Sequence, residues 1–315
     1  MSTLKGAIFG EMERIRSRAL DKNNPHGIHA VLHYQSGWFV HWAEGPSAAL
    51  RGLLQHLQHD PRHHSLHTLH ISRGLRLLHT PWSMAMSQST EPAVQFGRRV
   101  IALREQLEKG KQYSPPSVLR RLSAPMQLTR AQALPDPEAF HRVGICAASG
   151  NAAFDMVEWL AAQHGEPVVR RRFAGERDMD GSSEYVDFME NDHPCRMIAV
   201  ARTGLSHGLR RAFLPDWPYF VMLFTGSPPF DDDLMTRMVA ACEGLPVAPC
   251  LLGVAPDSIT HQRMRHMAQT AGLDYVIGDI TTPDNCAGIW EVVREQLQQA
   301  GPPPNSAWDV PRLAA

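Results

Sequence analysis

Apolar runs alternate with amphipathic stretches along the second half of the chain. Helical periodicity is found in Ala152–Gln163, Asp232–Glu243, Gln262–Ala271 and Ala287–Gln299. The runs that predict strands are Val143–Ala147, Val168–Phe173, Tyr185–Glu190, Arg196–Ala201, Tyr219–Thr225, Val247–Val254 and Tyr275–Ile280. Continuous apolar strands between helices predict a mostly parallel sheet that is covered on both faces. Only a short turn separates Tyr185–Glu190 from Arg196–Ala201, so we expect an antiparallel hairpin there.

Shorter elements fill the first ninety residues. The pattern predicts, in order, a strand Leu4–Phe9, a helix Glu11–Lys22, hairpin strands Gly27–Tyr34 and Gly37–Trp42, a helix capped by Ser47 and ended by Pro61, a strand through Leu69 and Ile71, and a last strand from Trp82 to Met86. The apolar stripe of the second helix consists of Leu50, Leu53, Leu54 and Leu57. This order predicts an α+β module in which two helices cover one face of a sheet.

A proline-rich stretch separates the two patterns. Glu91–Lys109 is predicted to be a helix, either a dimer contact or an intramolecular cap, and five prolines follow between Ser114 and Pro137. Because such a density of proline disfavours an ordinary helix, we expect a linker. The predicted organisation is a first domain at residues 1–90, a helix and linker at 91–140, a doubly wound α/β domain at 141–300 and a flexible tail at 301–315.

Charge and composition exclude some classes of partner. The chain carries 31 basic and 32 acidic residues, for a net charge of -1, so we expect neither a nucleic-acid nor a membrane partner. No apolar run reaches the ~20 residues that span a bilayer. The N-terminus shows no signal-peptide pattern, which predicts a cytoplasmic protein. Five cysteines without a CxxC pair predict buried thiols, and no metal site is expected.

Residues 4–88 carry several short motifs in a fixed order. They are Asn23-Asn24, the two hairpin strands, Glu44-Gly45, Asp60-Pro61-Arg62-His63 and Trp82-Ser83-Met84. Through these motifs the segment resembles a BLUF domain, a blue-light sensor that uses flavin and has a ferredoxin-like α+β fold. The resemblance implies that Asn23 contacts the flavin ring and that Trp82 and Met84 form the switching pair.

Two positions depart from what that family uses for photochemistry. The resemblance implies a tyrosine on the first strand and a glutamine on the third, where this chain has Phe9 and His41. Phenylalanine has no hydroxyl group, and imidazole lacks the paired donor and acceptor of an amide. The first helix is also shorter than the family norm. A retained flavin site would use Asn23, His41, Trp82 and Met84, but we expect no bound cofactor, with FAD as the open alternative.

The second domain resembles a small GTPase of the P-loop class, with degenerate motifs. Its phosphate loop keeps Gly150, but Asn151 and Ala152 stand where the family has lysine and a hydroxyl residue. The DxxG turn keeps Gly204 without its aspartate, and the asparagine and lysine of the guanine-reading motif are absent. Because phosphoryl transfer is catalysed by those positioned charges, we expect no nucleotide hydrolysis. A receiver-like or other doubly wound fold is the alternative.

No catalytic set emerges from the sequence. Asp231, Asp232 and Asp233 follow two prolines, and we expect them to cap a helix rather than bind a metal. The prediction is a non-enzymatic regulatory or scaffold protein that binds a protein partner, such as a signalling protein or a GTPase, as a homodimer or heterodimer. The alternatives are a flavin-binding blue-light or redox sensor and a nucleotide-dependent switch.

Overall fold

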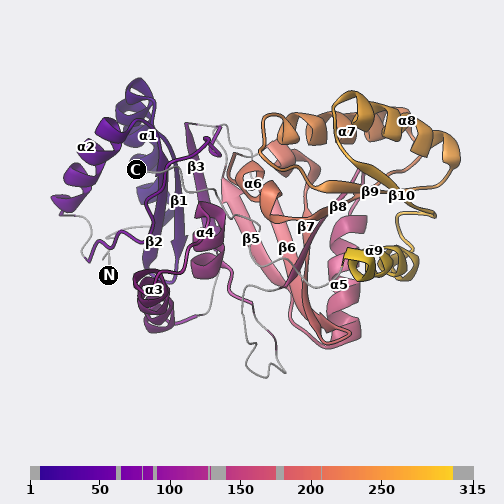
Figure 1. Ribbon diagram of the computed structural model, residues 1–315, viewed down its shortest axis with the longest axis horizontal. Coiled ribbons are helices and arrows are strands. Elements are labelled where there is room, and N and C mark those ends of the chain that lie inside the picture. The colour runs from indigo at the N-terminus through magenta and orange to yellow at the C-terminus, as the bar shows by residue number, and fades with distance from the viewer. Residues whose placement is uncertain are drawn as a thin grey trace. The chain divides into compact units, whose positions relative to one another are not determined.

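The computed structural model describes residues 8–61, 65–79, 81–87, 91–126, 128, 140–174, 181–206 and 208–300 (Figure 1). The chain divides into two compact units, the first of which consists of residues up to 125 together with 172–174 and 208–212. By position in the sequence, we call the elements up to residue 125 the N-terminal module and the elements from residue 140 onward the C-terminal module. The predicted fold class is confirmed, because a small sheet and a larger, mostly parallel sheet are both flanked by helices. Within the described ranges, no helix is long and apolar enough to cross a membrane.

Three strands form the sheet of the N-terminal module. They are β1 (His29–Gln35), β2 (Trp38–Glu44) and β3 (Trp82–Ser87). β1 lies between the other two, antiparallel to β2 and parallel to β3, so Leu32 is opposite His41 on one side and Met84 on the other. Ser36 and Gly37 form the two-residue turn between β1 and β2, both with positive φ angles (52° and 81°). The predicted hairpin is therefore confirmed.

Helices pack on both faces of this small sheet. The helices of the module are α1 (Ile8–Asn23), the 3-10 turn η1 (Asn24–His26), α2 (Ser47–Gln58), α3 (Ala93–Glu108) and α4 (Pro115–Ser123). α2 has no buried residue, so the prediction that it covers the sheet together with α1 is not met. Side chains alternate along a strand, and Ala30, Leu32 and Trp82 pack with Ile15 of α1 on what we call the α1 face. On the opposite face, Trp38 packs with apolar side chains of α3 and α4.

Two strands predicted in the first ninety residues were wrong. Phe9 lies in α1, so the predicted strand Leu4–Phe9 fails at this end, and its residues up to 7 lie outside the described part. Short apolar runs do not by themselves distinguish a strand from a helix. Leu69 and Ile71 lie in an irregular segment in which Ile71 is 84% exposed. Two alternating apolar residues were too weak a signal for a strand.

Proline begins helices in this chain instead of preventing them. The segment after α3 was predicted to be a linker, but its first part forms α4, and Ser114 caps that helix by accepting a hydrogen bond from the Ser117 amide. Prolines in a first turn lack only an N–H group that would have no partner within the helix. Ser47 is the first residue of α2 rather than its cap, because Pro46 occupies the cap position. Most of the predicted linker between residues 129 and 139, and the predicted tail at 301–315, lie outside the described residues.

Seven strands form the larger sheet. They are β4 (His141–Ala147), β5 (Val169–Ala174), β6 (Gly181–Glu190), β7 (His193–Val200), β8 (Tyr219–Leu223), β9 (Cys250–Ala255) and β10 (Tyr275–Ile280), in the spatial order β10-β9-β8-β4-β7-β6-β5. The strands from β10 to β7 in this order are parallel, and β6 is antiparallel to β7. Asn191 and Asp192, both with positive φ, make the turn between β6 and β7. All seven predicted strands and the predicted hairpin are confirmed.

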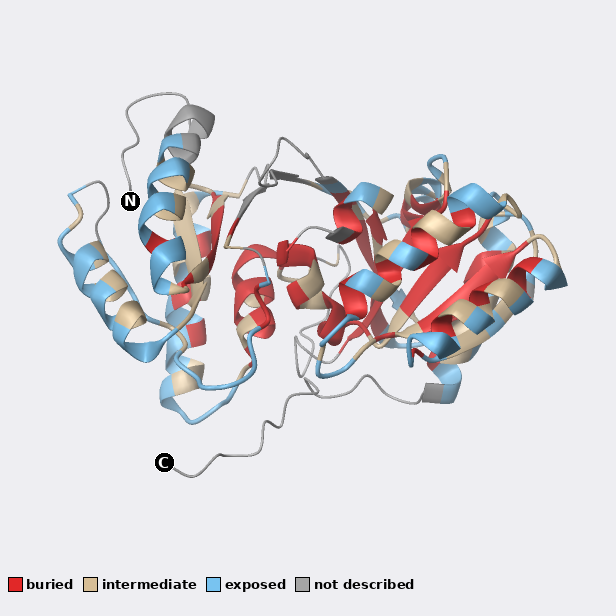
Figure 2. Cartoon of the chain, turned by 90° about the horizontal axis from the view of Figure 1, so that it is seen from above, coloured by how far each residue is buried: buried red, intermediate tan, exposed pale blue. Residues whose placement is uncertain are grey.

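Helices sandwich this sheet in two layers. They are α5 (Ala152–His164), α6 (Gly208–Phe213), α7 (Pro228–Cys242), α8 (Ser258–Thr270) and α9 (Cys286–Ala300), with the 3-10 turns η2 (Arg202–Ser206) and η3 (Leu214–Asp216). α5 and α9 pack on one face, while α7 and α8 pack on the other (Figure 1). Figure 2 shows the strands of this module almost wholly buried and its helices exposed on their outer sides. The two apolar layers explain why the strands are continuous apolar runs.

Two buried ion pairs cross the larger sheet. Arg196 on β7 binds Asp187 on β6 through two hydrogen bonds of 2.6 and 2.7 Å. Arg142 on β4 binds Asp216, with 3.3 Å between Nε and Oδ2. The Phe140 ring lies 4.7 Å from the Arg142 guanidinium carbon and 5.2 Å from that of Arg196. The carboxylates and the ring replace the water that these guanidinium groups lose on burial.

Gly144 tests how closely the centre of the larger sheet is packed. A Cβ atom at this position on β4 would lie 2.5 Å from the Phe220 ring and 2.8 Å from the Trp217 ring. We expect Gly144→Ala to lower the free energy of unfolding by about 1–3 kcal/mol, because overpacking forces rings out of their rotamers. Urea denaturation followed by tryptophan fluorescence measures the change.

Gly52→Ala is the matched control for this substitution. Gly52 lies inside α2 with open space around it, so alanine there should raise stability by about 0.5–1 kcal/mol through helix propensity. If Gly144→Ala leaves the urea midpoint unchanged, the close packing described for β4 is wrong.

Candidate functional site

The parallel strands of the C-terminal module end at one edge of the sheet, which we call the carboxyl edge. Doubly wound folds bind ligands at this edge, where the strand order reverses. The structure brings the predicted nucleotide residues together here: Gly150 and Asn151 follow β4, Ala152 begins α5, and Gly204 lies in η2 after β7. Gly150 has a φ of 69°, which favours glycine, and the Asn151 side chain makes no capping bond to α5.

Arg202 crosses the carboxyl edge. Its guanidinium donates to the carbonyl oxygen of Ala148 in the loop after β4, and its Nε atom lies 3.3 Å from Oδ2 of Asp233 on α7. Arg237 binds the same carboxylate at 3.0 Å, and this hydrogen bond is the main cause that lowers the pKa of Asp233. Charged groups at this edge are therefore bound to one another.

Asp231 stabilises the loop beside this cluster. It is fully buried and accepts hydrogen bonds from the amide and the hydroxyl of Thr225, at 2.8 and 3.1 Å. α7 begins earlier, at Pro228, so only Asp231 lies in its first turn. The prediction that the aspartates cap the helix start is wrong for Asp232 and Asp233, which pair with Arg263 and Arg237. Within the described ranges, no group of three or more His, Cys, Asp or Glu side chains could hold a metal ion.

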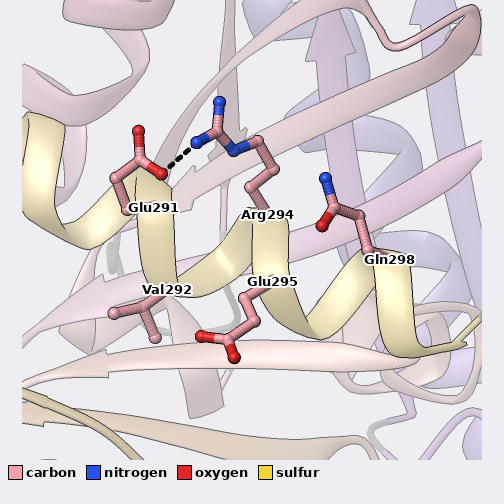
Figure 3. A pocket seen from close by; sticks show the side chains of 5 residues that line it. All are labelled: Glu291, Val292, Arg294, Glu295 and Gln298. Carbon is pink, nitrogen blue, oxygen red and sulfur yellow. Dashed lines mark hydrogen bonds and ion pairs between the residues drawn. The ribbon is translucent and has the colours of Figure 1, made fainter.

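Two shallow hollows lie elsewhere on the C-terminal module. One, of about 300 Å³, is lined by α9 side chains, Glu291, Val292, Arg294, Glu295 and Gln298 (Figure 3). Arg294 pairs with Glu291 and lies 3.8 Å from Glu190, so its charge is already balanced within the module. The other hollow, of about 540 Å³, lies between the ends of α7 and α8 and has a mainly apolar lining. Neither arrangement places a nucleophile beside a base.

The α1 face of the small sheet gathers the predicted cofactor residues. His41 on β2 is next to Leu32 on β1, and Trp82 and Met84 lie on β3. The rings of His41 and Trp82 are 6.1 Å apart, centroid to centroid, and tilted by 49°. Asn23 is the last residue of α1. The side chain of Met84 lies outside the described residues, so only its place on the strand is known.

His41 is a half-buried histidine on an apolar face of the sheet. Leu32 lies opposite it on β1, the Trp82 ring lies beside it, and the same face carries Ile15 and Ala19 of α1. The Nε2 atom is inaccessible to solvent and has no hydrogen-bond partner among the described residues. Burial lowers the pKa of His41 from 6.5 to about 4. The imidazole is therefore neutral at pH 7 and keeps an unused hydrogen-bonding atom on this face.

Asn23 adds a second polar group at the border of the face. It is 7% exposed, and its side chain makes no capping hydrogen bond to η1. Its backbone oxygen accepts from the Ile28 amide at 3.1 Å, which fixes the turn between α1 and β1. An amide buried without a partner costs free energy, so such groups mark a place for a polar ligand or water.

Glu44 holds the irregular segment after α2 against β2, a role that sequence reasoning missed. One carboxylate oxygen accepts hydrogen bonds from the amides of Leu77 and Leu78, both at 2.8 Å, and the other accepts from the Trp42 indole at 3.2 Å. Gly45 follows because a Cβ there would lie 3.1 Å from a backbone oxygen of the β1 entry. The Glu44-Gly45 pair in the sequence was the signal for this contact.

Comparison with known proteins bears on the N-terminal module. Residues 2–85 match the family model described as BLUF, sensors of blue-light using FAD. This chain has an N-terminal BLUF domain. A solved structure of a bacterial light-regulated adenylyl cyclase is 14% identical, with a TM-score of 0.26, and the match covers 74% of this chain and 85% of that chain. At that score the likeness carries no argument. No curated protein matches the chain.

The BLUF domain differs from its family at two positions that the resemblance ties to photochemistry. His41, expected at the glutamine position, lies on β2 with its ring beside that of Trp82 on the α1 face. Phe9, expected at the tyrosine position of the first strand, lies instead in α1, and its side chain is outside the described residues. The tyrosine that the structure places on the α1 face is Tyr34, whose ring lies 5.2 Å from that of Phe39.

The residues of the α1 face fit a flavin ring. Such a ring presents hydrogen-bonding atoms along one edge and an apolar surface on both sides. The Nε2 atom of His41 is an unused polar group, Asn23 carries a nearly buried amide, and Leu32 and Trp82 offer apolar contacts. The polar groups come from α1 and β2, and the apolar ones from β1 and β3.

The buried histidine makes the BLUF domain sensitive to acid. The pKa of His41 is about 4 in the folded chain and 6.5 in the unfolded chain. Between these two pH values the imidazole is protonated in the unfolded chain and neutral in the folded chain. Stability is therefore lost as the pH falls from about 6.5 to about 4. We expect a loss of about 2 kcal/mol between pH 7.5 and pH 5 from this group.

His41→Gln should remove most of that pH dependence, since glutamine does not titrate. Urea denaturation of the full chain at the two pH values measures it, with His266→Gln, an exposed histidine on α8, as the control. An acid sensitivity that is equal in the wild type and in His41→Gln would contradict the burial described for this side chain.

Proposed function

We propose that the BLUF domain binds FAD on its α1 face and acts as the sensory part of a regulatory protein. The observation that carries the proposal is the buried Nε2 atom of His41, which lies on this face without a partner in the described part of the chain. Asn23 and His41 would bind the polar edge of the flavin ring, and Trp82 would pack against it. The bound flavin would supply a group that changes its hydrogen bonding on illumination or on reduction.

FAD binding by the full-length chain tests the proposal directly. Protein incubated with FAD and then separated from free cofactor should retain the visible absorbance of flavin. His41→Leu and Asn23→Ala should each weaken the affinity about threefold to tenfold, because each removes one hydrogen bond worth about 0.5–1.5 kcal/mol. His266→Leu on α8, which is exposed and lies outside the BLUF domain, should bind like the wild type.

Two results would overturn this assignment. FAD that fails to remain with the folded protein would remove the sensory role. FAD that remains equally well in His41→Leu and Asn23→Ala would show that the cofactor lies away from the α1 face. A bound flavin spectrum that responds to neither blue light nor reductant would leave a binding domain without a sensor.

We further propose that the C-terminal module is non-enzymatic and acts through a protein partner, for which a signalling protein is the expected class. Support comes from the carboxyl edge, where Arg202, Asp233 and Arg237 bind one another and Asp231 binds Thr225. Gly150 after β4 and Gly204 in η2 lie at this edge, and Arg202 joins the two loops by donating to the carbonyl oxygen of Ala148. This pairing favours partner binding over a nucleotide-dependent switch.

Nucleotides provide the test of this second proposal. Magnesium-GTP, magnesium-ATP and the diphosphates should leave the melting temperature of the full chain unchanged, because a ligand raises it only by binding the folded state. The outcome against it is a rise that depends on nucleotide concentration and disappears in Arg202→Ala. Val247→Ala, at an exposed site distant from this edge, controls for a general effect of mutation.

A further inference from the structure

The residue type at position 41 changes what the α1 face can do chemically. A glutamine amide carries fixed donors and a fixed acceptor and takes up no proton near neutral pH. An imidazole has one donor and one acceptor nitrogen, exchanges them between tautomers, and can also accept a proton. His41 therefore brings a group that can titrate near neutral pH to a position where the family pattern has an amide.

The surroundings of His41 keep that group neutral until an anion arrives. Leu32 lies opposite His41 on β1 and the Trp82 ring lies beside it. The same face carries the apolar side chains Ile15, Ala19 and Leu20 of α1 and Phe39 and Ala43 of β2, together with the titratable Tyr34 of β1. Burial of His41 in this environment disfavours the imidazolium and lowers the pKa of the group to about 4. In such a medium an anion next to Nε2 would stabilise the protonated form strongly.

A flavin ring offers that anion when it is fully reduced. Reduction by two electrons and one proton turns an acceptor nitrogen of the ring into a donor and leaves one negative charge on the ring near neutral pH. Facing that nitrogen in an oxidised ring, Nε2 of His41 can only donate. Facing the same nitrogen in a reduced ring, Nε2 can accept, or the imidazole can take a proton from solvent and pair with the charge of the ring. Hydrogen bonds between charged groups are about twice as strong as neutral ones.

We infer that His41 makes the α1 face select the reduced flavin ring over the oxidised ring, so that the BLUF domain reports redox state. The inference rests on the proposed binding of FAD. It assigns His41 as a specificity-determining residue, because this side chain supplies the interaction that differs between the two oxidation states. Asn23, an amide without a titratable proton, contributes to both states alike.

The experiment compares the affinity of the full chain for oxidised FAD in air and for FAD reduced with excess dithionite under nitrogen. Equilibrium dialysis gives both dissociation constants, and their ratio is the readout. The wild type should bind the reduced form at least tenfold more tightly than the oxidised form. His41→Gln should lower this ratio about tenfold while changing the affinity for oxidised FAD by less than about threefold, since an amide donor remains.

The controls separate this inference from the binding proposal beneath it. His266→Gln should keep the wild-type ratio, and Asn23→Ala should weaken both oxidation states by the same factor. If FAD binds but the ratio is equal in the wild type and in His41→Gln, the redox selection is wrong and the flavin site stands. If the wild type binds FAD in neither oxidation state, both the inference and the proposed function are wrong.

Discussion

A polar group that leaves water during folding must find a partner inside the protein or lose several kcal/mol, and the larger sheet is organised around that requirement. Arg196 and Arg142 lie on adjacent parallel strands and are almost completely buried. Asp187 and Asp216 satisfy them from within the same module. Removing one partner would leave an unpaired buried charge, which is far more costly than losing a surface ion pair. The strands can therefore be apolar elsewhere and still hold charges at fixed places.

His41 departs from that requirement in the small sheet. Its Nε2 atom is buried without a partner among the described residues, so the folded chain carries a cost that a ligand could relieve. The same reasoning separates the two candidate regions. The carboxyl edge of the C-terminal module has paired its charges internally, whereas the α1 face has left polar atoms available. Local energetics thus favours the α1 face as the place where a small molecule binds.

The sequence predicted the C-terminal module well because each of its strands is buried on both faces, and such a strand must be a continuous apolar run. The sequence-based prediction was wrong where a residue type has a different effect at a particular position of an element. Prolines after Ser114 suggested a linker, yet two prolines in the first turn begin α4. Leu69 and Ile71 suggested a strand, yet the segment is held by Glu44 through its backbone amides instead of by a neighbouring strand. Contacts of this kind join residues that are far apart in the chain, and they produce no periodic pattern of apolar residues in the sequence.

The sequence indicated which residues form the candidate site, but not the burial and protonation state of His41. Motif order named Asn23, His41, Trp82 and Met84, which the structure places on α1, β2 and β3. What the sequence could not provide was the burial of His41, which depends on side chains contributed by α1 and β1. A histidine at an exposed position of a strand would be in contact with water and would have no unused nitrogen. Burial, a tertiary property, turns it into a neutral group with an unused nitrogen.

The Glu44 contact also has a mechanical consequence. Its carboxylate grips the chain at Leu77 and Leu78, a few residues before β3 begins, and His29 at the start of β1 donates from Nδ1 to the Leu78 carbonyl oxygen at 2.6 Å. The end of β2 and the entrance to β3 are thus tethered directly, although β1 lies between these strands in the sheet. A displacement of β2 would therefore move the start of β3 through these hydrogen bonds, without a change in the position of β1.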